Sequence, residues 1–281
     1  MVDEWAVRQP HPALRPFISR YIGYRRHEVT PRVHRGLPSR YATLVISLEQ
    51  PVRMARVDQP GRGLQALVGG IHLAPMLIEQ DRSQTGLHLQ LNPLGTRMLL
   101  GFPAAELSGV VADLADLGSP GLVALPDRLA ATNSWRRRFA ILDEVFLAHL
   151  AAVAPARASP PEVGQAWRRL LTAGGGVRVG ALAEEVGWSG RHLTERFRRE
   201  LGLTPKQAAR VLRFERAGAL LRQHGPGDLA GVAVACGYYD QAHLSNEWRA
   251  LAGCSPGTWI AEELPALQDL AGTADEKYQG T

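Results

Sequence analysis

Basic side chains gather in one short stretch of the sequence. Residues 189–222 contain nine of them against three acidic residues, a local charge of +6, whereas the whole chain of 281 residues carries +5. The nine are Arg191, Arg196, Arg198, Arg199, Lys206, Arg210, Arg213, Arg216 and Arg222. The arginine fork suits phosphates and guanine edges, although a bias toward GC-rich codons also favours arginine. The charge indicates a polyanionic partner, with nucleic acid as the first candidate.

A pattern of small, glycine and apolar residues occurs twice around this stretch. The first copy consists of Ala183, Gly187, Leu193, Phe197, Gly202 and Thr204-Pro205, and the second of Ala233, Gly237, Leu244, Trp248, Gly253 and Ser255-Pro256. In each copy a small residue lets two helices approach, a glycine tolerates the positive backbone angle of a turn, and two apolar residues anchor a second helix. One copy alone is equally typical of an ordinary helical hairpin. Two copies in the same order predict two helix-turn-helix units, whose second helices enter DNA major grooves.

The second helix of the first unit is expected to begin after Ser189 as its N-cap. Since Leu193 and Phe197 are expected to face the core, the opposite side of this helix is the candidate DNA-binding face. Its candidate residues are Ser189, Gly190, Arg191, Thr194, Glu195, Arg198 and Arg199. The same reasoning applies to the second unit, where Asp240 is the expected N-cap. Its candidates are Asp240, Gln241, Ala242, His243, Ser245, Asn246 and Arg249.

The residue types of the first unit suggest which side chains contact bases and which contact phosphates. We expect Arg191 to read guanine, and Arg198 and Arg199 to contact phosphate. Glu195 either accepts a hydrogen bond from a cytosine amino group or forms an ion pair with Arg191 or Arg199 on a solvated face. Both alternatives remain open at this point.

In the second unit, Gln241 and Asn246 are base-reading candidates, and Asn246 would favour adenine. His243 either contacts phosphate or is an ordinary surface histidine. Arg213 and Arg216 either help to orient the helix between the units or, in the case of Arg213, serve as a structural ion-pair partner.

The two units need a spacer of suitable length. Thr204-Pro205 places an N-cap ahead of a proline at the first helical position, which predicts a helix of roughly 18 residues ending near 225–227. Such a helix spans about 27 Å at 1.5 Å per residue. Successive major grooves on one face of DNA lie about 34 Å apart, so one chain could read two groove segments.

The chain divides at a Pro/Ala/Ser-rich segment. We predict an N-terminal regulatory or dimerisation domain at 1–153, a linker at 154–162, an all-helical DNA-binding domain at 163–264 with seven helices, and a flexible tail at 265–281. The first domain should contain strands at 41–48, 64–68, 73–78 and 86–91 and helices near 93–101, 103–107 and 135–153. The last of these helices packs on its own domain or on a second subunit. The predicted fold class is therefore α+β.

Several other classes of protein do not fit the sequence. No apolar run approaches the roughly 18 residues of a membrane helix, and residues 1–5 lack the order of a signal peptide, so we expect a cytoplasmic, nucleoid-associated protein without a membrane partner. Cys236 and Cys254 are expected to be packing residues. His72 and His88 lie apart from any metal-ligand motif, and Gly174-Gly175-Gly176 lacks the Lys of a phosphate loop. We therefore expect no metal, no cofactor, no catalytic residues and no enzymatic activity. His11, His27 and His34 are expected on the surface.

Residues 165–263 resemble the DNA-binding domain of the AraC/XylS family of bacterial transcription regulators. The resemblance rests on 182–189, 191–193, 202–205, 237–238, 240–241 and 253–256, which match the core of both units. It implies sequence-specific binding to double-stranded promoter DNA, with RNA polymerase as a partner if the protein is an activator. Asn246 and Trp248-Arg249 depart from the Arg and Phe-Lys that the family usually has, which puts the strength of the second helix's contacts in doubt.

The N-terminal half resembles the regulatory domains that precede this module in the family, through residues 12–18, 68–70 and 99–107. This resemblance implies a small cupin-like β domain that binds a small-molecule effector or mediates a homodimer.

Overall fold

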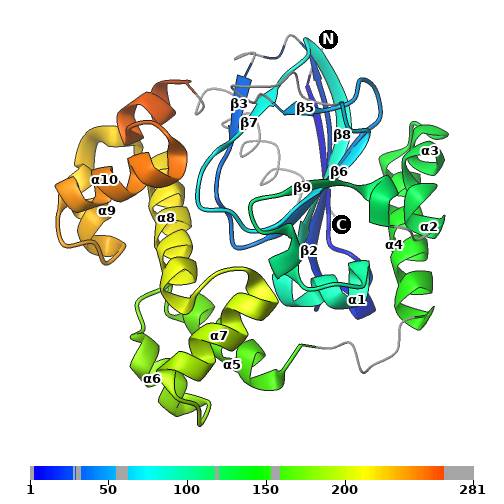
Figure 1. Cartoon of the computed structure of the whole chain (residues 1–281). Helices are drawn as coiled ribbons and strands as arrows, with labels where there is room; N and C mark the ends of the chain where they lie inside the picture. The colour runs from blue at the N-terminus through cyan, green and yellow to red at the C-terminus, as the bar shows by residue number, and fades with distance from the viewer. Residues whose placement is uncertain are drawn as a thin grey trace.

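The computed structural model describes residues 3–27, 29, 33–54, 63–117, 120–152 and 159–262. A β-rich N-terminal domain is followed by an all-helical C-terminal domain (Figure 1). This agrees with the predicted α+β class. Residues 154–158 of the predicted linker and the predicted tail at 265–281 lie outside the described residues.

The N-terminal domain contains two antiparallel sheets. The larger has the strand order β1 (Glu4–Arg8), β2 (Ile18–His27), β8 (Ser83–Leu91), β4 (Ala42–Ser47), β6 (Ala66–Gly69) and β9 (Val111–Asp113). The smaller has the order β3 (Val33–Gly36), β7 (Met76–Glu79) and β5 (Arg53–Met54). The four predicted strands correspond to β4, β6, β7 and β8.

The larger sheet has two chemically different faces because side chains alternate along each strand. Leu87, Leu89 and Leu91 are fully buried and form a core with apolar residues of α4 (Trp135–Ala152). Gly23 of β2 lies beneath this helix, and a Cβ there would be only 2.5 Å from Cε3 of Trp135. The amphipathic face of α4 is therefore occupied by its own domain.

Helix α4 is also held to the sheet by a buried carboxylate. Asp143 accepts hydrogen bonds from the hydroxyl of Tyr21 at 3.1 Å, the backbone N–H of His11 at 2.9 Å and the guanidinium of Arg8 at 2.9 Å. Burial and the neighbouring carboxylate raise the pKa of Tyr21, so its hydroxyl stays a donor.

Short helices complete the N-terminal domain. They are η1 (Pro12–Leu14), η2 (Pro93–Gly95), α1 (Thr96–Leu100), η3 (Ala104–Leu107), η4 (Leu114–Leu117), α2 (Pro120–Val123) and α3 (Leu125–Ala130). The predicted helices at 93–101 and 103–107 correspond to η2 with α1 and to η3. Asn92 caps η2 by accepting from the N–H of Leu94 at 3.1 Å.

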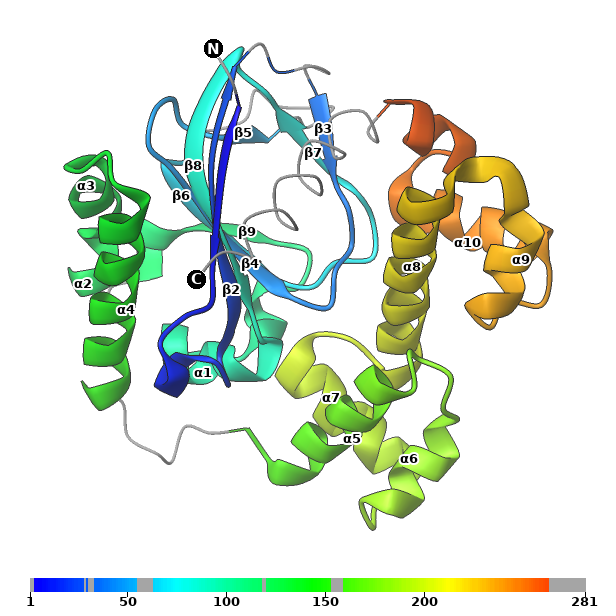
Figure 2. The same ribbon diagram turned by 180° about the vertical axis from the view of Figure 1, so that it is seen from behind.

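The C-terminal domain has seven α-helical segments within residues 159–262. Its helices are α5 (Pro161–Thr172), α6 (Val179–Glu185), α7 (Gly190–Leu201), α8 (Pro205–His224), α9 (Leu229–Ala235) and α10 (Gln241–Ala252), with a further helical segment at 256–262 and the short η6 (Gly225–Asp228) between α8 and α9. Figure 2 shows α5, α6 and α7 at one end of α8 and α9 and α10 at the other. Each end has its own apolar core, around Trp167 and Phe197 in the first and around Phe214 and Trp248 in the second.

The two domains share part of their cores. Ile71, in the segment between β6 and β7, is 1% exposed and packs in the core around Trp167. Leu73 packs against both helical cores. None of the described helices is both long enough and apolar enough to cross a membrane.

Candidate nucleic-acid interface

The first unit consists of α6, a turn and α7. Gly187 has φ of 70°, where a side chain would be strained, and Ser189 caps α7 by accepting from the N–H of His192 at 3.2 Å. Leu193 and Phe197 are fully buried in the core of the unit. These contacts fix the rotation of α7 about its axis, as the apolar spacing predicts.

The opposite face of α7 is open to solvent. Gly190, Arg191, Thr194, Glu195 and Arg198 together line a shallow hollow of about 490 Å³. Arg191, Glu195 and Arg198 are exposed, and Thr194 is half-buried. Arg199 is exposed beside this hollow but does not line it. The structure thus brings five of the seven candidates of the first unit together on one surface.

Hydrogen bonds within the helix distinguish among these candidates. The hydroxyl of Ser189 is engaged as the cap, and that of Thr194 donates to the carbonyl of Gly190 at 2.7 Å. Glu195 has no ion pair with Arg191 or Arg199 among the described residues. The guanidinium of Arg191 and the carboxylate of Glu195 therefore both face solvent.

The second unit repeats this geometry with α9, a turn and α10. Gly237 has φ of 75°, and Asp240 caps α10 by accepting from the N–H of His243 at 2.7 Å. Leu244 and Trp248 are fully buried, four residues apart, like their counterparts in α7. The duplication read from the sequence is thus a duplication of structure.

The second exposed face is composed differently. Gln241, Ala242, His243, Asn246 and Arg249 are exposed, whereas Ser245 is half-buried. Arg249 donates to Oδ1 of Asn246 at 3.1 Å, and the N–H of Tyr239 donates to Nδ1 of His243 at 3.2 Å. A bidentate contact from Asn246 to adenine uses both its oxygen and its amide nitrogen, so this contact requires Arg249 to release the oxygen.

Helix α8 joins the units and begins at a capping box. The side chain of Thr204 accepts from the N–H of Gln207 at 3.2 Å, and the side chain of Gln207 accepts from the N–H of Thr204 at 2.9 Å. The helix has 20 residues, two more than expected, and is about 30 Å long at 1.5 Å per residue.

Part of the basic stretch is structural. Arg210 donates to Glu247 of α10 at 2.8 Å, and Arg213 lies 3.7 Å from the same carboxylate. Arg213 also donates to the carbonyl of Gly175 at 3.5 Å and lies over the ring of Tyr238. Arg213 is therefore an ion-pair partner that links both units to α8, so the charge of +6 overstates what is available to DNA. The sequence did not single out Glu247, because this carboxylate is distant in sequence from its partners.

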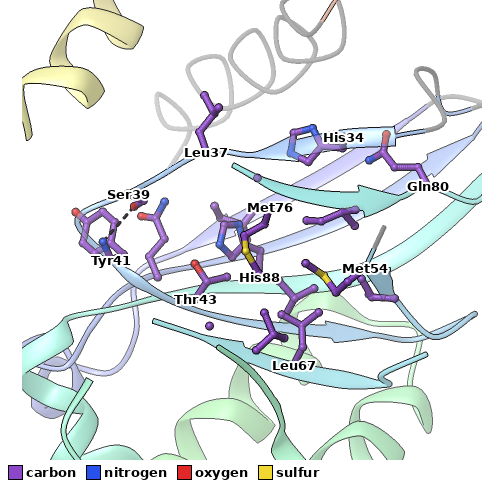
Figure 3. A pocket seen from close by; sticks show the side chains of 18 of the residues that line it. His34, Leu37, Ser39, Tyr41, Thr43, Met54, Leu67, Met76, Gln80 and His88 are labelled. Carbon is purple, nitrogen blue, oxygen red and sulfur yellow. Dashed lines mark hydrogen bonds between the residues drawn. The ribbon is translucent and has the colours of Figure 1, made fainter. Parts of the chain in front are cut away.

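A second feature, which sequence reasoning missed, is a pocket of about 780 Å³ between the two sheets and α8 (Figure 3). Alternate residues of β2, β4 and β8 form its floor, among them Arg20, Ile22, Val45, His88 and Gln90. Helix α8 contributes one stripe, namely Glu215, Gly218, Ala219 and Arg222. The i, i+3, i+4, i+7 spacing of this stripe was the only sequence signal for the pocket.

Charges on the pocket wall are unevenly paired. Glu215 accepts from Arg40 at 2.7 Å, and Arg53 pairs with Glu79 and Asp81. Arg20 and Arg222 form no ion pair among the described residues. Both arginines line the pocket: Arg20 lies near His88, and Arg222 lies over the ring of Trp259 and near the charge of Glu215.

Two histidines also lie in this pocket. His34 was expected on the surface, and the structure corrects this, because β3 turns His34 into the pocket (Figure 3). His88 keeps part of its surface open to the cavity, but its Nε2 is buried without a hydrogen-bond partner. Burial, then the charges of His34 and Arg20, lower the pKa of His88 to about 4. Within the described residues, no group of three His, Cys, Asp or Glu side chains is arranged to hold a metal.

Known proteins share these features. A family profile described as a helix-turn-helix domain matches residues 182–262, which extend from within α6 through α10. No curated protein matches the sequence. The structure of an apo ToxT variant from Vibrio cholerae has a TM-score of 0.52 at 7% identity, over 91% of this chain and 99% of that chain. ToxT bound to (E)-4-(8-methylnaphthalen-1-yl)but-3-enoic acid has a TM-score of 0.51 at 9% identity, over 92% of this chain and 98% of that chain.

The likeness to ToxT extends over both domains, whereas the profile identifies the helical one. Residues 182–262 are therefore a helix-turn-helix domain of the AraC type, in a chain that has the two-domain fold of ToxT.

Proposed function

We propose that this protein is a sequence-specific transcription regulator that places α7 and α10 in successive major grooves of promoter DNA. The observation that carries the proposal is the pair of capped, outward-facing helices at the two ends of α8. The spacer of about 30 Å suits grooves about 34 Å apart.

Side-chain chemistry supports a division of roles. Arg191 and Glu195 on α7 and Gln241 on α10 are the base readers in this proposal, since all three are exposed on the faces opposite the buried anchors. Arg198 and Arg199 contact phosphate and position the helix. Ser189 and Asp240 act as caps that fix the two helix starts.

The spacing of the two DNA segments tests this proposal. A duplex that binds the protein is first selected from a random-sequence pool, and its two half-sites are then separated by five extra base pairs. This insertion moves one half-site to the opposite face of the helix, so affinity should fall to that of a single half-site. An insertion of equal length outside the half-sites is the control. Unchanged affinity after the internal insertion would refute simultaneous binding by both helices.

We also propose that a small organic acid in the pocket modulates DNA binding. Arg20 and Arg222 provide the anion-binding groups, and Ile22, Val45 and Met76 provide apolar lining. ToxT has been crystallised with an unsaturated fatty acid, at a TM-score of 0.50 and 9% identity over 91% of this chain and 97% of that chain. Because α8 forms one wall, a molecule bound in the pocket contacts the helix that spaces the two units.

Thermal unfolding in the presence of oleate and of a naphthyl-butenoic acid tests this part. A bound ligand raises Tm in proportion to RT ln(1 + [L]/Kd). Binding should raise the Tm of the wild type and not that of Arg20→Ala. Arg128→Ala, which removes an exposed pair with Glu144 outside the pocket, should respond like the wild type. An equal rise in Tm in all three proteins would show that Arg20 does not bind the ligand.

The remaining partners follow from the proposed function. A regulator of this kind acts in the cytoplasm at the nucleoid, and it contacts RNA polymerase if it activates transcription. A homodimer would use a surface other than the apolar face of α4, which is buried against its own sheet.

A further inference from the structure

The N-terminal domain binds the carboxylate of Glu200, at the C-terminal end of the first recognition helix, α7. The two carboxylate oxygens of Glu200, whose side chain is only 6% exposed, accept from Nε and an NH2 group of Arg97 at 2.7 and 3.0 Å. The hydroxyl of Ser159 donates to the same carboxylate at 2.9 Å. Bidentate charge-assisted hydrogen bonds fix orientation as well as distance. We call Arg97, Ser159 and Glu200 the α7 clamp.

The backbone beside the α7 clamp is packed just as closely. Gly202 ends α7 with φ of 78°, and a Cβ there would lie 2.6 Å from Cβ of Ser108. The hydroxyl of Ser108 lies 3.4 Å from the carbonyl oxygen of Gly202. Only glycine fits both the backbone angle and the contact. The C-terminal end of α7 is thus seated on η3 of the N-terminal domain.

The α7 clamp leaves the reading face of the helix open. Arg191 lies nine residues before Glu200, about 14 Å along the helix axis. A tilt of about 10° about Glu200 would therefore move Arg191 by about 2 Å, enough to break a bidentate hydrogen bond to a base. The orientation of α7 at its buried end consequently decides what its exposed end can reach.

The same chain segment connects the α7 clamp to the pocket. Strand β8 carries His88 and Gln90 on the pocket floor, and the chain continues through Asn92 and η2 to Arg97. Asn92 anchors this connection, since its side chain donates to the carbonyl of Pro16 at 2.9 Å and accepts from the N–H of Leu94 at 3.1 Å. Seven residues thus separate Gln90 on the pocket floor from Arg97.

We infer that Arg97 and Glu200 are positioning residues through which the N-terminal domain sets the angle of the first recognition helix. This inference rests on the proposed binding to DNA and goes beyond it, because it makes the N-terminal domain a determinant of recognition at one half-site. The end of α10 also packs on the N-terminal domain, since a Cβ at Gly253 would lie 3.0 Å from Cγ of Pro75, but among the described hydrogen bonds and ion pairs none joins α10 to that domain.

Half-site-specific binding measurements test the inference. The half-site read by α7 is first identified as the one whose discrimination Arg191→Ala relaxes. Arg97→Met should then lower affinity for the full selected duplex about tenfold and reduce the penalty for base changes in that half-site. The penalty for changes in the other half-site should stay as in the wild type. Arg97→Lys, which retains the charge and one donor group, should restore part of the affinity.

Controls separate this effect from general damage. Arg128→Met removes an exposed pair with Glu144 in the same domain, outside the pocket, and should bind like the wild type. Arg97→Met/Glu200→Gln should be no weaker than the worse single variant, because both remove one interaction. Equal loss at both half-sites, unchanged affinity or increased affinity in Arg97→Met would overturn the inference. If the wild type bound no duplex, the proposed DNA binding would be refuted, and with it the inference that rests on it.

Discussion

Arg191 lies in the first turn of α7, exposed and on the rim of the hollow that five recognition-helix residues line. Among the described residues it forms no ion pair with Glu195, its neighbour on that face, so the guanidinium of Arg191 faces solvent. A fork that is both exposed and held by a well-capped helix suits bidentate binding to O6 and N7 of guanine.

Replacing Arg191 with alanine tests this role. We expect specific binding to weaken by about 1 to 3 kcal/mol and discrimination at one base pair to relax. Arg191→Lys retains the charge without the fork and should recover nonspecific affinity but not discrimination. Titration of duplexes substituted at each position measures both effects. Equal losses on every sequence would identify Arg191 as a phosphate contact.

His88 predicts a dependence of stability on pH. Its pKa is lowered to about 4 in the folded protein, so the unfolded chain, with a histidine pKa of 6.5, takes up the proton first as pH falls. The contribution to the free energy of unfolding is fully present above pH 6.5 and is lost between pH 6.5 and 4, up to about 3 kcal/mol. Urea unfolding across this range should show the loss in the wild type and a smaller one in His88→Gln. Identical dependence of the free energy of unfolding on pH in the two proteins would contradict this role of His88.

At the scale of elements, α8 fixes the relation between the two units through Glu247. This carboxylate, 17% exposed, accepts a hydrogen bond from Arg210 at 2.8 Å and forms an ion pair with Arg213 at 3.7 Å. Because both arginines lie on α8 and Glu247 lies on α10, the pair sets how the second recognition helix lies against the spacer.

Removing this carboxylate should loosen α10. We expect Glu247→Gln to lower the free energy of unfolding by about 2 kcal/mol, the range for a hydrogen bond to a charged partner. Glu185→Gln is a matched control, because its pair with Arg169 is exposed on both sides and should contribute about 0 to 1 kcal/mol. Denaturant titration of both variants measures the difference, and equal losses would show that Glu247 is no tie between the helices.

Local patterns predicted some elements and not others. Strand β8 was predictable because Leu87, Leu89 and Leu91 alternate with polar residues. Strand β2 was not predicted, since Arg20 and Arg26 occupy its pocket face and the register shifts between Ile18 and Arg20, which breaks the alternation. The apolar alternation of β2 is therefore interrupted by arginines on the face that lines the pocket.

The candidate site divides in the same way. Caps and exposed faces of α7 and α10 follow from spacings of three and four residues and could be predicted. The pairs Arg97–Glu200 and Arg40–Glu215 could not, because their partners lie 103 and 175 residues apart. Contacts of that kind depend on how the domains pack, which periodicity does not encode.

At the scale of the whole molecule, the exposed basic residues predict a salt dependence. The candidate phosphate contacts Arg198 and Arg199 are exposed, and so is Arg249, a third arginine among the DNA-binding candidates. Each released counterion adds about −0.9 to the slope of log K against log salt, so we expect a slope of about −3 or steeper. Arg199→Ala should make the slope shallower by about 1, measured by fluorescence anisotropy at several salt concentrations. A slope near zero would contradict DNA binding through phosphate contacts.

The central claim is that one chain reads two successive grooves on one face of DNA. Hydroxyl-radical footprinting of a duplex selected from a random pool tests it most directly. We expect two protected segments on the same face, with centres about one helical turn, or 10 base pairs, apart. Arg191→Ala should weaken protection of one segment only. A single protected segment, or two segments on opposite faces, would contradict the account.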